Sequence, residues 1–263
     1  MLANLKRLVG YRPLIQSLVA RDLKARYRGS VLGFLWSFVN PLLLLSIYTF
    51  VFTVVMPGAR PGLEPYSLFM FCGLLPWTWF SSSVLESATV LVAGGNLIRK
   101  VLFPAEVLPI VNVFAGFVHF CLGMLIVAGA VVYFRVSVSP QELLWLPVIV
   151  LVQLILTLGV ALIVSVITVH FRDMRDLLGN LLQLLFFATP ILYPLTAVPP
   201  TLQPLMKFNP FTHLARAYQD VLFYQGPFTE ARSLLLLGAF SVALLLISLA
   251  LFDRLRDTLP EAV

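Results

Sequence analysis

Residues 21–41, RDLKARYRGSVLGFLWSFVNP, place a block of positive charge directly against an apolar run. Four of the first eight residues are Lys or Arg, and no charged residue follows from Gly29 to Met56. An apolar run of this length exceeds the roughly 20 residues that a helix needs to cross a bilayer. Basic residues beside a span favour the cytoplasmic side. The stretch therefore predicts a first membrane span that its basic flank orients.

The whole composition agrees with a membrane protein. The chain has 263 residues, of which 60% are hydrophobic and 11% charged, whereas a soluble domain carries about 25% charged residues. The net charge of +6 does not indicate nucleic-acid binding, because the basic residues lie at the ends of apolar runs. Cys72 and Cys121 fall within predicted spans, where small packed residues are expected rather than a disulfide.

Six apolar segments of spanning length follow one another, separated by charged or turn residues. We expect an all-α integral membrane protein with spans at 31–56, 66–91, 106–133, 143–168, 176–193 and 231–252. The segment 194–230 is too polar and too rich in proline to cross. We expect two short amphipathic helices there, which form a re-entrant pair on the outer side, where protein must shield their backbone.

The distribution of Lys and Arg predicts the orientation. With six spans, thirteen of the eighteen basic residues fall on the side of both termini and five on the other. The first set is Lys6, Arg7, Arg12, Arg21, Lys24, Arg26, Arg28, Arg99, Lys100, Arg172, Arg175, Arg254 and Arg256; the second is Arg60, Arg135, Lys207, Arg216 and Arg232. Both termini are therefore expected in the cytoplasm.

Residues 13–28 have the pattern of an amphipathic helix. At 100° per residue, Leu14, Leu18 and Leu23 share a broad apolar face, while Arg21 and Lys24 lie on the opposite face. This pattern predicts an interfacial helix that lies in the membrane plane. The alternative is a generic cytoplasmic anchor, which needs positive charge but not amphipathicity.

Motifs for energy conversion are missing from the sequence. No Lys precedes Ser or Thr, so the G-x-x-x-x-G-K-[ST] phosphate loop is absent. The three histidines show no metal-ligand spacing. Apart from the first two residues of each predicted span, only Glu86 and His119 are ionisable groups within the spans, whereas a proton-coupled carrier usually buries several carboxylates. The driving energy is therefore expected to come from another chain.

Two helical stripes suggest a lined path through the membrane. Phe34, Phe38, Tyr48 and Phe52 share one face of the first span, which also contains Pro41. Rings and amides suit a path for sugars, because hydroxyls bond to amides and the apolar face of a sugar stacks on rings. The alternative is that these aromatic rings pack on other helices or on lipid.

A polar stripe in the fifth predicted span supports such a path. Asp176, Asn180, Gln183 and Phe187 recur at steps of four, three and four. Unpaired amides in hydrocarbon are costly, so they should face the bundle interior or a water-filled route. The alternative is hydrogen bonding between helices, which contributes about 0.6 kcal/mol per contact.

Four blocks resemble the ABC-2 type permeases that export polysaccharide, such as O-antigen, capsule and teichoic-acid transporters. They are RDLKARYRGSVLGFLWSFVNPLL, VLFPAEVLPIV, FRDMRDLLGNLLQLLFFATPILYP and FNPFTHLARAYQDVL, and together they cover nearly the whole chain in order. The resemblance implies one transmembrane permease domain over 1–263, located in the bacterial cytoplasmic membrane. It implies a homodimer that binds two copies of a separate ATPase, uses ATP only through that partner, and moves a lipid-linked glycan.

The resemblance also assigns roles to residues. Phe34, Phe38, Tyr48, Phe52, Asn180, Gln183 and Phe187 would line the glycan channel. Asn96, Arg99, Lys100 and Phe103, in the loop GGNLIRKVLFP, would couple to the ATPase. Arg21, Lys24, Arg26 and Arg28 would frame the cytoplasmic entrance, where Pro41 could kink the first span. An ABC-2 exporter of a drug or lipid, a secondary carrier and a non-transporting scaffold are the alternatives.

Overall fold

The computed structural model describes residues 10–55, 63–95, 103–171 and 173–255. Within these ranges every regular element is helical, which confirms the all-α membrane fold. The helices are α2 (Arg12–Arg26), α3 (Trp36–Phe50), α4 (Tyr66–Ala93), α6 (Val107–Tyr133), α7 (Leu146–His170), α8 (Met174–Phe187), α9 (Gln203–Phe208), α10 (Pro210–Leu222) and α11 (Ala231–Leu255). Short 3₁₀ or π turns join some of them.

Five helices in the described part of the chain are long and apolar enough to cross a membrane. They are Gly33–Phe50, Tyr66–Ala93, Val107–Tyr133, Glu142–His170 and Ala231–Leu255, and each matches one predicted span. The fifth predicted span, 176–193, differs. Its helix α8 has 14 residues and ends at Phe187, so it is about 21 Å long at 1.5 Å per residue.

A proline explains why α8 stops early. Pro190 follows the end of α8 and cannot donate the hydrogen bond that would continue the helix, and the residue before a proline avoids the helical region. The chain turns instead, and α10 holds this turn. The side chain of Gln219 donates to the carbonyl of Pro190 at 3.0 Å, and that of Asn209 donates to the Thr189 hydroxyl at 2.8 Å.

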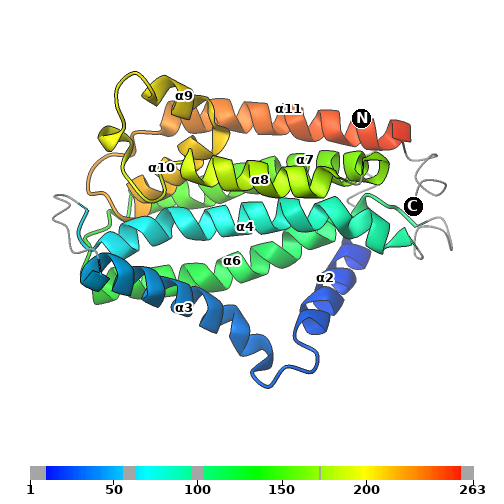
Figure 1. Cartoon of the computed structure of the whole chain (residues 1–263), viewed down its shortest axis with the longest axis horizontal. Coiled ribbons are helices and arrows are strands. Elements are labelled where there is room, and N and C mark those ends of the chain that lie inside the picture. Colours follow the sequence, from blue (N-terminus) through cyan, green and yellow to red (C-terminus); the bar gives the residue numbers. More distant parts are fainter. Residues whose placement is uncertain (1–9, 56–62, 96–102, 172, 256–263) are drawn as a thin grey trace.

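Helix α4 lies at the centre of the bundle (Figure 1) and contacts α3, α6, α7, α8 and α10. Two glycines bring α6 close to it, as small residues do in membrane bundles. A Cβ on Gly123 would lie 2.5 Å from Leu75, and one on Gly116 would lie 2.8 Å from the Ser83 hydroxyl. These contacts show that the two glycines allow α6 to pack closely on α4.

Helices α2 and α3 form a V that diverges from the bundle, with its tip at the connection between them (Figure 1). The tip turns sharply at Gly29 and Gly33, whose φ angles are +81° and +51°. Residues with a Cβ rarely adopt such angles. Helix α2 packs against α6, and in α3 only Ser37 is buried, while the other residues are half-buried or exposed.

The two ends of the bundle differ in content (Figure 1). Helix α2, the start of α6 and the end of α11 lie at one end. The short helices α9 and α10 lie at the other, where α4 and α11 begin. The two short helices predicted in 194–230 are α9 and α10. Helix α10 packs against α4, α7 and α11.

Candidate translocation surface

The polar stripe of α8 points straight out of the protomer. Leu178 and Leu182 are buried against the bundle, and the stripe lies on the opposite side of the same helix. Asn180 and Gln183 are exposed, as is Phe187 at 58%. Neither amide has a hydrogen-bond partner among the described residues. Of the two locations predicted for these amides, the interior of a single chain is excluded, because Leu178 and Leu182 occupy that side; a water-filled route stays a prediction.

The aromatic stripe of the first span divides into two parts. Phe34 is 47% exposed at the tip of the V, and its ring meets Phe38 edge to face at 6.4 Å. Phe52 instead packs against Tyr66 of α4 at 4.8 Å and is stacked with Tyr48 at 6.3 Å. Tyr48 and Phe52 therefore help to attach α3 to α4, whereas Phe34 at the tip of the V is exposed.

A polar pocket of about 260 Å³ lies between α3, α4 and α6. Helix α4 contributes Thr78, Ser82 and Glu86, and α3 contributes Asn40 and Pro41. The sequence reasoning missed this α4 face. The sequence does contain a pattern that indicates this face. It is the recurrence, at steps of four, of Thr78, Ser82 and Glu86, which places them on one face of a helix.

Arg26 anchors α2 to the bundle at this pocket. Its guanidinium donates to Glu86 of α4 at 2.6 and 3.2 Å, to Asp22 at 2.8 Å and to the Asn112 side chain of α6 at 3.2 Å. Burial lowers the pKa of Arg26, but the hydrogen bonds that it donates to Glu86 and Asp22 outweigh burial and raise the pKa overall. Arg26 is therefore already neutralised, while Arg21, Lys24 and Arg28 are exposed.

A second set of hydrogen bonds ties the tip of the V to α6. The Nδ1 of His119 lies 2.9 Å from the carbonyl of Ala115 and must donate to it, so Nε2 is an acceptor in the neutral imidazole. The Tyr27 hydroxyl donates to Nε2 and accepts from the Ser37 hydroxyl at 2.7 Å. Both ionisable groups predicted within spans, Glu86 and His119, thus bind the segment that carries α2.

The corner between α10 and α11 holds a compact charge network. Glu230 pairs with Arg216 at 2.7 Å and lies 3.5 Å from His213. Burial raises the pKa of Glu230, but His213 and Arg216 outweigh it, so the pKa falls below its ordinary value. Nearby Asp220 accepts from the backbone and hydroxyl of Thr229, yet burial raises its pKa. Every carboxylate here has a partner inside the protomer.

Comparisons with known proteins agree with this arrangement. The ABC-2 type transporter family matches residues 13–223. This chain belongs to that family. It is 40% identical to the O-antigen export system permease protein RfbA of Myxococcus xanthus, over the whole of both chains. It is 36% identical to an RfbA of Klebsiella pneumoniae, over 94% of each chain, and 27% identical to the polysialic acid transport protein KpsM of Escherichia coli, over 92% and 93%. These relatives are permease or transport proteins and not enzymes.

The predicted coupling segment of this ABC-2 chain is only partly visible. Asn96, Arg99 and Lys100 lie outside the described residues. Phe103 is half-buried and packs against the cluster of Leu18 and Val107, under α2. Helix α2 therefore covers part of Phe103, and a coupling role for this residue stays a prediction.

Proposed function

We propose that this chain is the membrane subunit of an ATP-driven exporter that moves a lipid-linked, O-antigen-like polysaccharide across the bacterial cytoplasmic membrane. The observation that carries the proposal is the unpartnered amide stripe on the outer side of α8. Amides that face hydrocarbon cost several kcal/mol each. Such a face in a membrane protein requires a polar neighbour that the protomer itself does not supply.

A second copy of the chain is the neighbour we propose. In a homodimer, the α8 stripe and the exposed part of α3 would enclose a route between two protomers. The α3–α4 pocket would add hydroxyls and a carboxylate near the cytoplasmic entrance, beside Arg21, Lys24 and Arg28. Sugar hydroxyls can exchange hydrogen bonds along such a surface, and rings such as Phe187 offer contact without strong directional bonds.

Two ATPase subunits complete the proposed machine. The sequence has no phosphate loop of its own, and membership of the ABC-2 family supports a partner that hydrolyses ATP. The segment that contains Asn96, Arg99, Lys100 and Phe103 is the proposed contact. Because Phe103 packs under α2, movement of this contact would be passed to the interfacial helix. No cofactor on this chain is needed.

The proposed orientation places α2 in the cytoplasm and α9 outside. Cysteines at Arg21 and Lys207 test it, because both residues are exposed and lie at opposite ends of the bundle. A Cys121→Ser background removes the exposed native thiol. In intact cells, an impermeant thiol reagent should label the Lys207 variant and not the Arg21 variant. The reverse pattern would contradict the orientation.

The export route is tested by the rate of glycan export per folded permease. Alanine at Phe38 or Phe187 should slow export more than it lowers the amount of folded protein. If both rings only pack, export and abundance should fall in proportion, since loss of a buried ring costs about 3–5 kcal/mol of stability. Leu244 of α11 is not a suitable control, because it packs against Gly159 of α7. Leu236, 65% exposed, replaces it.

A further inference from the structure

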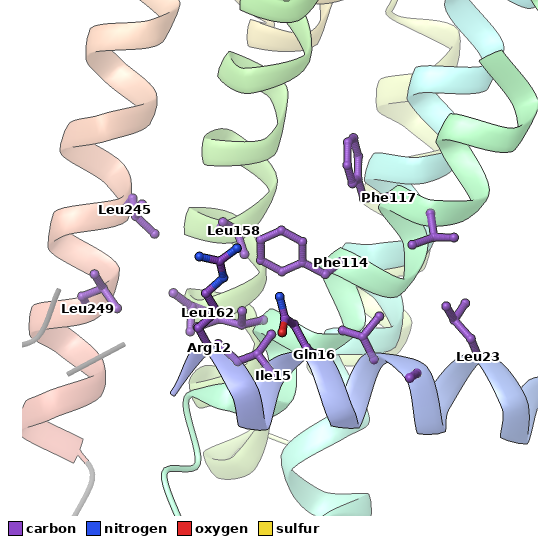
Figure 2. Close-up of a pocket in the computed structure, with 14 residues that line it drawn as sticks. Arg12, Ile15, Gln16, Leu23, Phe114, Phe117, Leu158, Leu162, Leu245 and Leu249 are labelled. Carbon is purple, nitrogen blue, oxygen red and sulfur yellow. The ribbon is translucent and has the colours of Figure 1, made fainter. Parts of the chain in front are cut away.

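An apolar groove lies on different helices from the proposed export route. It has a volume of about 770 Å³ and lies between α2, α6, α7 and α11 (Figure 2). No residue of α3 or α8 lines it. The volume is within the 300–1,000 Å³ range of typical ligand pockets. Its walls include Phe114, Leu158 and Leu245, from three candidate spans, so the groove meets hydrocarbon in a membrane.

Two polar side chains enter this groove from α2. Arg12 and Gln16 point from the helix toward the space beside Phe114 and Leu158 (Figure 2). No carboxylate among the described residues pairs with Arg12, and the Gln16 amide has no hydrogen-bond partner there. A guanidinium aimed along an apolar wall strongly favours an anionic partner.

The rest of α2 separates this groove from the other basic residues. Leu18 packs on Val107 and Val111 of α6, while Arg21 and Lys24 lie on a third, exposed side of the helix. Val19 and Leu23 continue the groove face beyond Gln16. Helix α2 therefore packs on α6 with one side and is exposed on a second side. Its third side places the Arg12 cation at the end of the apolar groove.

We propose that the groove binds one anionic phospholipid of the surrounding membrane. The phosphate accepts hydrogen bonds from Arg12 and Gln16 at the level of the interfacial helix, and an acyl chain lies along Phe114, Leu158 and Leu245. Basic pockets between membrane helices on the cytoplasmic side are suited to acidic head groups. A bound lipid would join α2 to α6, α7 and α11, which would fix the helix that covers Phe103.

The test measures which lipids stay bound to the full-length chain. The protein is exchanged into nanodiscs with equal amounts of phosphatidylglycerol and phosphatidylethanolamine, released, and weighed by native mass spectrometry. Wild type should retain phosphatidylglycerol in clear preference. Arg12→Gln removes the charge and should reduce that preference about tenfold, the effect of losing one charge-assisted contact. Arg175→Gln, which removes an exposed cation of α8, should leave it unchanged.

A second variant fills the groove without removing the cation. Ala20 lines the groove and is exposed, so Ala20→Trp should displace the lipid while the protein stays folded, as judged by its melting temperature. Equal retention of phosphatidylglycerol by wild type and Arg12→Gln would overturn the proposal. So would equal loss in the Arg175 control. In nanodiscs prepared from a membrane extract, retention of a polyprenyl phosphate in place of the phospholipid would also overturn it.

Discussion

Helices α8 and α10 are both too short to span a bilayer, yet their polar side chains differ in whether they have hydrogen-bond or ion-pair partners within the chain. In α10, Gln219, Arg216 and Asp220 all find partners within the protomer. In α8, Asn180 and Gln183 point outward and find none among the described residues. The polar groups of α10 therefore stabilise the protomer, and those of α8 are free to bind a molecule outside it. Substitutions in the two helices should separate stability from transport.

The largest loss of stability is expected from Arg216→Ala. It leaves Glu230, whose side chain is 6% exposed, with only the more distant His213 at 3.5 Å, and breaking a buried pair costs about 3 kcal/mol or more. The melting temperature in detergent should fall by several degrees. Lys207→Ala, which removes an exposed cation at the same end, is the control. An equal melting temperature for Arg216→Ala and wild type would show that the network does not hold α10.

A smaller loss is expected from Arg26→Ala, which detaches α2 from α4. The expected cost is about 1 kcal/mol, because the Glu86 side chain is 44% exposed and water screens the pair. Arg26→Lys should restore only part of the stability, since an ammonium cannot bind a carboxylate in the two-pronged way of Arg. Melting curves of the three proteins measure this. Full rescue by Lys would mean that charge alone suffices.

The two carboxylates near α10 should respond to pH in opposite directions. Burial raises the pKa of Asp220, so the folded state holds its proton more tightly than the unfolded chain, and Asp220 costs stability as the pH rises above about 4. The melting temperature of Asp220→Asn relative to that of wild type should therefore rise as the pH increases from 4 to 7. Glu230 has a lowered pKa, and its stabilising effect should disappear as the pH falls below about 4. A cost of Glu230→Gln that does not shrink on acidification would refute this assignment.

The smallest effect on stability, but a clear effect on transport, is expected from Asn180→Leu combined with Gln183→Leu. Neither amide bonds within the described protomer, so the melting temperature of the monomer should not fall. Export per folded permease should drop about fivefold or more, the effect of losing hydrogen bonds of about 1 kcal/mol. Leu181→Met, at an exposed position between them, is the matched control. Unchanged export would leave the stripe as a lipid-facing surface.

The sequence alone determined the membrane class, five long spans and the position of α2. Length and apolar content decide whether a helix can cross hydrocarbon, and both are local properties. The residues that recur on one helical face were also visible, including the α4 face that was missed. Family membership followed from the order of the four blocks, and the comparisons confirmed it.

Only the tertiary structure decided which face of each helix is already occupied. The α8 pattern has an apolar and a polar side, but only the contacts of Leu178 and Leu182 show that the polar side faces out. Periodicity also could not show that Arg26 pairs with Glu86, 60 residues away in the chain, or that Phe103 lies under α2. Such pairings depend on how distant helices pack, because a side chain's partner is set by the shape of the whole bundle rather than by its neighbours in sequence.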